Sequence, residues 1–239
     1  MKKSKILKIV ISLLFFFVLV LTFFLNSNSN LEITEKEAKD EIIKQYQALE
    51  SNTLLENSSV VLDYQKMFNN SSIVGELYIP NTELKVPVAQ GEDNDYYLNH
   101  LLDKSYNTLG SVFLDYRNNV DDKKIIIYGH NSQDITTEFH MLENYLDYDY
   151  YKRYSDIYFE TINNKYHYKI FSVYIATNDY QHVNLKLFDA SYQKHLDWLL
   201  QQSIYDTGVL VNRDDDILIL QTCYFEPKDS FLIIAAKKI

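Results

Sequence analysis

The feature that most constrains the fold is a series of short apolar runs, each of a length suited to one β-strand. The runs are rich in β-branched and aromatic residues, which fit a half-buried pleated surface. They occupy Val74–Ile79, Leu84–Ala89, Ser111–Asp115, Lys124–His130, Ile157–Ile162, Tyr166–Ala176, Asp216–Cys223 and Phe231–Lys237. Turn-forming pairs such as Pro80-Asn81 and Asn163-Asn164 separate them. This arrangement predicts a closed or nearly closed β-barrel of about eight strands.

Helical patterns precede and interrupt the strand-like runs. They occupy residues 33–50, Val61–Phe68, Glu138–Leu146 and Ala190–Ser203. The chain is therefore expected to be mainly β with inserted helices, an α+β fold. We assign residues 26–72 to a linker and N-terminal helical segment and residues 73–239 to the barrel domain.

The N-terminus predicts a membrane anchor. Residues 9–25 carry no charge and approach the length of about 17–25 residues that spans a bilayer as a helix. Four lysines lie in residues 1–8, so the positive-inside rule places this stub in the cytoplasm and the remaining chain outside. The alternative is a cleaved signal peptide, but the apolar run ends in Phe23-Phe24-Leu25 and not in small residues. We favour an uncleaved single-pass anchor, and both interpretations export the barrel domain.

Charge and motifs exclude several classes of function. The formal net charge is −10, with 33 acidic and 23 basic residues, which disfavours binding to nucleic acid. The sequence contains no H-E-x-x-H motif, no cluster of cysteines and no glycine-rich phosphate loop. We therefore expect neither a metal nor a cofactor.

Two strand-like runs end in side chains suited to nucleophilic chemistry. Lys124–His130 contains three consecutive isoleucines and stops at a histidine, and Asp216–Cys223 stops at the only cysteine of the chain. A thiol beside an imidazole loses its proton more readily, and the thiolate is the attacking species. A lone cysteine is nevertheless more often a small buried apolar residue. The residues alone leave both interpretations open.

Several motifs, in the same order along the chain, resemble those of the class B sortases, Gram-positive cysteine transpeptidases that join proteins to the cell wall. Together they extend from about Gly75 to the C-terminus. They are Gly75–Pro80 with Val86–Gly91, Asp93–Leu98, Gly110–Asn118, Tyr128–His130 and Leu220–Cys223.

The resemblance implies a two-step acyl transfer. Cys223 would attack a threonine carbonyl in the C-terminal sorting signal of an exported surface protein, and His130 would protonate the leaving amine. An amine of a peptidoglycan cross-bridge, or of its lipid-linked precursor, would then resolve the thioester. The membrane anchor would keep the enzyme, its substrate and the wall precursor at the outer face of the membrane.

The resemblance also implies weaker roles in binding substrate or stabilising the oxyanion. These roles fall on Thr222, Tyr224, Asn94 and Tyr128. The family carries an arginine at the start of its last strand, and here that position is Phe231. Phenylalanine donates no hydrogen bond, and one lost oxyanion donor typically costs about 10²–10³ in rate.

Other groups are candidates to replace the missing arginine. They are the backbone N–H groups near Tyr224 and the side chains of Lys228, Arg117 and Arg213. For Arg117 we favour a structural ion pair, and Lys228 is expected to be a solvated loop charge.

Two further functions remain open at this stage. Phe231 motivates a catalytically impaired sortase-like module that binds peptides. A secreted Cys–His peptidase that only hydrolyses wall peptides is the third possibility.

Overall fold

The computed structural model describes residues 20–21, 27–48, 59–132 and 137–239. The chain divides into two compact units, Met1–Glu41 and Ile42–Ile239. Residues 27–48 are helical, which agrees with the predicted helix at 33–50 as far as residue 48. Most of the predicted anchor at 9–25 lies outside the described residues. Among those that are described, no helix combines the length and apolarity needed to cross a membrane.

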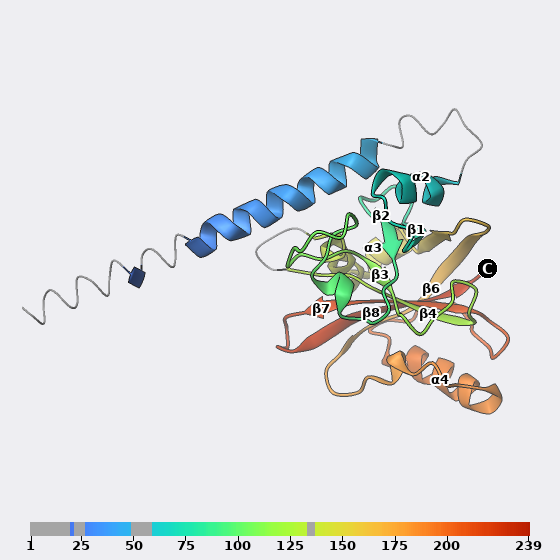
Figure 1. The fold of residues 1–239 in the computed structure, drawn as a ribbon. Helices are drawn as coiled ribbons and strands as arrows, with labels where there is room; N and C mark the ends of the chain where they lie inside the picture. Colours follow the sequence, from blue (N-terminus) through green and yellow to red (C-terminus); the bar gives the residue numbers. More distant parts are fainter. Residues whose placement is uncertain (1–19, 22–26, 49–58, 133–136) are drawn as a thin grey trace, which may run out of the picture. The chain divides into compact units, whose positions relative to one another are not determined.

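Eight strands of the described residues form a closed barrel, which confirms the predicted fold class (Figure 1). Their order around the barrel is β1-β2-β3-β4-β7-β8-β6-β5, and β1 closes the barrel by pairing with β5. The strands are β1 (Ile73–Tyr78), β2 (Lys85–Ala89), β3 (Phe113–Leu114), β4 (Lys124–Tyr128), β5 (Asp156–Glu160), β6 (Lys165–Ala176), β7 (Ile217–Tyr224) and β8 (Ser230–Lys238).

Two predicted strands are shorter in the structure than in the sequence pattern by two residues or more. The run Ser111–Asp115 contributes only the two residues of β3. The run Lys124–His130 ends as β4 at Tyr128, although the Gly129 N–H still donates to the carbonyl of Gln221 at 3.2 Å. A Cβ at Gly129 would lie 2.6 Å from the ring of Phe139. The absence of a side chain at this position therefore lets the chain pass close to Phe139 just before His130.

Short helices occupy the connections between strands. They are α2 (Val60–Met67), η1 (Tyr96–Leu98), η2 (His140–Leu146), α3 (Tyr148–Arg153), η3 (Gln181–Val183) and α4 (Asp189–Gln202). The predicted helix Glu138–Leu146 is a 3-10 helix, η2. The prediction missed α3, whose first turn is capped by the Asp147 side chain accepting from the Asp149 N–H.

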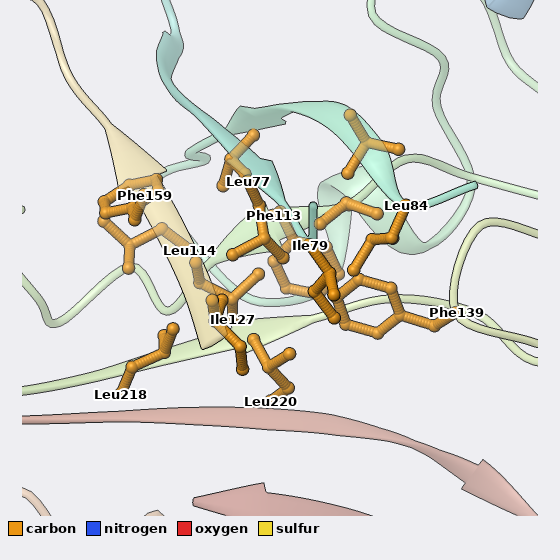
Figure 2. Close-up of a cluster of buried hydrophobic side chains, with 14 of the residues drawn as sticks. Leu77, Ile79, Leu84, Phe113, Leu114, Ile127, Phe139, Phe159, Leu218 and Leu220 are labelled. Carbon is orange, nitrogen blue, oxygen red and sulfur yellow. The ribbon is translucent and has the colours of Figure 1, made fainter. Parts of the chain in front are cut away.

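Alternation along the strands divides the buried side chains into two layers. Leu218 and Leu220 of β7 join the cluster inside the barrel, which Figure 2 shows with side chains from β1, β3, β4 and β5. Ile217 and Ile219 point to the other face, where they pack with Leu196 and other residues of α4. This outer layer lies between the sheet and α4 (Figure 1).

Candidate active site

The parallel pairing of β4 with β7 brings the ends of these two strands together. Tyr128 pairs with Gln221, and His130 and Cys223 each follow two residues later. The Thr222 hydroxyl extends the pairing by donating to the Gly129 carbonyl at 2.8 Å. Because side chains alternate with a period of two, this register places Cys223 on the outer face of the sheet, beside the position of His130. The fold thus joins two segments that are far apart in sequence.

Hydrogen bonds hold both the backbone next to His130 and the His130 ring. The His130 carbonyl accepts from the Thr137 hydroxyl at 2.6 Å, and the Asn131 amide donates to the Cys223 carbonyl at 3.0 Å. His130 Nε2 lies 2.7 Å from the Leu98 carbonyl oxygen. Because a carbonyl oxygen only accepts, Nε2 carries the proton, and in the neutral ring Nδ1 is then the basic nitrogen.

The Cys223 side chain is partly buried. Burial raises the pKa of its thiol above the ordinary value. In this conformation the thiol is therefore protonated at neutral pH, and a base must remove the proton before the sulfur can attack.

The position resembling the family's arginine lies directly opposite the thiol. Phe231 of β8 pairs with Cys223 on one side and with Ala176 of β6 on the other. Its ring packs edge-to-face against Tyr180, with 5.7 Å between the ring centroids. An aromatic surface therefore flanks the cysteine where a cation is expected.

The three side chains that could replace the arginine differ in their surroundings. Arg117 donates to both carboxylate oxygens of Asp115, at 2.8 and 2.6 Å, which confirms the structural ion pair. Arg213 precedes β7, whereas Cys223 lies near its other end, about 20 Å away at the usual rise per residue. A replacement role for Arg213 is therefore wrong. Lys228 is exposed in the turn between β7 and β8, as expected.

Asn94 and Tyr128 meet at the carboxylate of Asp115. The Asn94 amide donates to Asp115 at 3.1 Å and the Tyr128 hydroxyl donates at 2.8 Å. Burial alone would raise the pKa of Asp115, but the hydrogen bonds from Arg117, Tyr128 and Asn94 outweigh it and lower the pKa. Asn94 and Tyr128 therefore belong to one ionised hydrogen-bond network around Asp115.

Thr222 and Tyr224 alternate with Cys223 along β7 and lie on the opposite face of the strand. Thr222 is buried, and its hydroxyl is engaged with Gly129. The Tyr224 carbonyl accepts from the Ser230 hydroxyl at 3.1 Å. The Thr222 hydroxyl, predicted to contact substrate, instead links the ends of β7 and β4.

Two further histidines are buried, and no local sequence pattern marks their partners. His182 lies 2.9 Å from the Gln221 side-chain oxygen, and burial lowers its pKa to about 4. His195 of α4 accepts from the Lys124 ammonium at 2.8 Å. Their partners, Gln221 and Lys124, come from strands that are distant in sequence. Within the described ranges, no group of three or more His, Cys, Asp or Glu could hold a metal ion.

Comparison with known proteins gives consistent matches. Residues 77–239 match the model of the sortase domain. The chain is 37% identical over 164 residues to sortase B of Listeria monocytogenes, covering 67% of this chain and 65% of that protein. It is 33% identical over 172 residues to sortase B of Staphylococcus aureus, covering 70% of each. A solved Staphylococcus aureus sortase B–substrate complex superposes with a TM-score of 0.74 at 28% identity, covering 87% of this chain and 98% of that one.

Proposed function

The chain belongs to the sortase family, in its class B branch, and from this premise we propose that it is a cysteine transpeptidase acting on the C-terminal sorting signals of exported proteins. The observation that supports the proposal is the β4–β7 register, in which Tyr128 pairs with Gln221 two residues before His130 and Cys223. A matching solved structure is a sortase B–substrate complex, which supports substrate binding by the corresponding domain of this chain.

The reaction would proceed in two steps, acylation of Cys223 and then transfer of the acyl group to an amine. The Cys223 thiol gives its proton to Nδ1 of His130, and the sulfur attacks the carbonyl carbon of the substrate peptide bond. The tetrahedral intermediate collapses, the C–N bond breaks, and the leaving amine takes the proton from His130. An acceptor amine then attacks the thioester and gives its proton to His130, and the sulfur leaves as the thiol or thiolate.

The hydrogen bond from Nε2 to the Leu98 carbonyl supports this role for His130. It holds the ring in one tautomer and stabilises the imidazolium that forms after proton transfer. The raised pKa of the Cys223 thiol makes proton transfer a required step, because little thiolate is present before substrate binds.

The N-terminal apolar segment would set where the reaction takes place. We propose that residues 9–25 anchor the chain with its N-terminal stub in the cytoplasm, so that the barrel domain acts outside the cell. The acceptor would be an amine of a peptidoglycan cross-bridge or of its lipid-linked precursor, both of which lie near that membrane face.

Mass spectrometry of the full chain provides the test. The chain is incubated with a library of sorting-signal peptides, with and without triglycine as the acceptor amine. We expect an acyl adduct on Cys223 and, when triglycine is present, a ligated product. The Cys223→Ala variant is the matched control and should give neither.

One observation favours a second function, a catalytically impaired peptide-binding module. Phe231 stands opposite Cys223 and supplies neither charge nor hydrogen-bond donor. Peptide binding that is equal in the wild type and in Cys223→Ala, with no adduct in either, would favour this module. Hydrolysis without ligation, even with abundant triglycine, would instead identify a peptidase.

A further inference from the structure

A second surface with distinctive chemistry lies on the same face of the sheet as Cys223, toward the opposite end of β4. It is a pocket of about 710 Å³ between the loop before β4, the segment after η3 and the start of α4. Its lining includes four basic residues and one acidic residue, although the chain as a whole carries a net charge of −10. We call it the lysine pocket, after Lys123, Lys124 and Lys186.

The charges of this pocket are only partly balanced. Arg117 is already paired with Asp115, and Asp122 accepts from the Asn118 amide at 3.1 Å and the Asn119 N–H at 2.8 Å. Within the described part of the chain, no carboxylate forms an ion pair with any of the three lysines. The pocket therefore keeps an excess of positive charge, which attracts anions.

The three lysines differ in what holds them. Lys124 is buried, and its ammonium donates to the Asn184 carbonyl and to His195, each at 2.8 Å. Lys186 is exposed, and the Lys123 ammonium lies 5.2 Å from the centroid of the Tyr192 ring. One fixed and two adjustable ammonium groups thus line one concavity, as suits a ligand with several acceptor oxygens.

Apolar side chains adjoin these charges. Leu185, Leu187 and Phe188 also line the pocket, and Phe188 is 76% exposed to solvent. Together these three side chains form an apolar edge beside the ammonium groups. The combination fits an anionic head group that continues into an apolar chain.

We propose that the lysine pocket binds a phosphate-bearing ligand, whose phosphate oxygens contact Lys123 and Lys186 while an apolar portion packs on Phe188. The phosphate can belong to a soluble diphosphate or to the head group of a membrane lipid. Lys124 pairs with Ile217, six residues before Cys223 on β7, which corresponds to about 20 Å along the strand.

A ligand bound in the pocket is close enough to reach Cys223. This part of the inference rests on the proposed function. An extended peptide of about six residues spans 20 Å. An acceptor whose carrier phosphate sits in the lysine pocket can therefore present its amine at the Cys223 thioester.

Lysine acetylation of the full chain, read by mass spectrometry, tests the pocket without turnover. The Cys223→Ala protein is labelled with an acetylating reagent over a range of inorganic pyrophosphate concentrations. At ten times the dissociation constant, Lys123 and Lys186 should be acetylated about tenfold more slowly. Lys152, an exposed lysine of α3 paired with Asp149, is the internal control and should not change.

A second arm identifies the source of the phosphate. The same labelling is done in phosphatidylcholine vesicles with and without a polyprenyl diphosphate. Protection that appears with this lipid and is weakened by Phe188→Ala identifies a membrane ligand, whereas protection by pyrophosphate alone identifies a soluble one. Both outcomes support the pocket.

If neither pyrophosphate nor the lipid changes the acetylation rates of Lys123 and Lys186 relative to that of Lys152, the proposal is overturned. Because the experiment uses the Cys223→Ala protein, that result would leave the transpeptidase proposal standing. Conversely, a chain that forms no acyl adduct could still show protection of the pocket lysines.

Discussion

The two ends of the β4–β7 pair share one sheet face but have opposite chemistry. At one end, His130 and Cys223 follow the strands, and the thiol is partly buried beside the aromatic ring of Phe231. At the other end, the lysine pocket gathers ammonium groups around Lys124. The difference shows that one pair of strands can position a protonated thiol at one end and a cationic surface at the other. Only the length of the strands separates the two.

The largest expected effect is at the reactive end. His130→Ala should lower the rate of transpeptidation by about 10⁴, the upper part of the range for a general acid–base, because the histidine serves both steps. Steady-state kinetics with a sorting peptide and triglycine measures this rate. His100→Ala, on a half-buried histidine stacked on Tyr96, is the matched control and should stay close to wild type.

A loss of rate below tenfold in His130→Ala would break the comparison at this end. It would mean that the two strand ends are held together for structural reasons, through contacts such as the Asn131 amide on the Cys223 carbonyl.

The next largest effect is expected at Phe231, the aromatic residue opposite Cys223. Phe231→Arg should raise the rate of acyl-enzyme formation by about 10², because a cationic donor then stands opposite the thiol. Phe231→Leu removes the ring without adding a donor and should give no gain. Single-turnover mass spectrometry of the acyl adduct compares the three proteins. If Phe231→Arg is no faster than wild type, the oxyanion is already stabilised by other groups, such as backbone N–H near Tyr224.

The sequence predicted most of the barrel because its signals are local. Runs such as Ile125–Ile127 and Ile217–Leu220 show their strand character by composition. The candidate catalytic residue follows three residues after the end of each run. Resemblance to a family then identified His130 and Cys223 as partners. Their parallel register, which places them on one face, was visible only in the structure.

The parts that sequence could not predict depend on contacts between distant segments. Lys124 begins a strand and would normally be expected at the surface, but Asn184 and His195 cover it from 60 and 71 residues away. Thr222 was expected to contact substrate, but the pairing of β4 with β7 turns its hydroxyl to Gly129. No local pattern encodes either partner.

The Asp115 network lies between the two ends, and its loss should be a smaller effect on stability. Asp115→Asn should lower the free energy of unfolding by about 2–3 kcal/mol, because the Arg117 guanidinium and the Tyr128 hydroxyl lose an ionised acceptor. Urea denaturation measures it. Asp149→Asn breaks an exposed ion pair with Lys152 and should change stability by less than about 0.5 kcal/mol. Equal effects in the two variants would show that the buried network contributes no more than a surface pair.

The smallest expected effect is the pH dependence of stability at the cationic end. Burial, and then the positive charge of Arg117, lower the pKa of Lys124 to about 7. His195, which accepts from its ammonium, is neutral because its own pKa is lowered to about 3 by burial and by the charge of Lys124. Above pH 7 the unfolded chain therefore holds a proton on Lys124 that the folded chain has released. Stability must then rise with pH from about 7 toward the unfolded pKa of about 10.4.

Lys124→Met removes this contribution. Between pH 7 and 8 the free energy of unfolding of the wild type should rise by about 1 kcal/mol relative to Lys124→Met, measured by urea denaturation at matched ionic strength. Taking the difference between the two proteins cancels other titrating groups, including Glu76 of β1, whose pKa burial raises to about 7. Lys152→Met changes an exposed lysine and should keep the wild-type slope. If Lys124→Met also keeps it, Lys124 stays fully charged in the folded protein, and the two ends differ in charge even more than the structure implies.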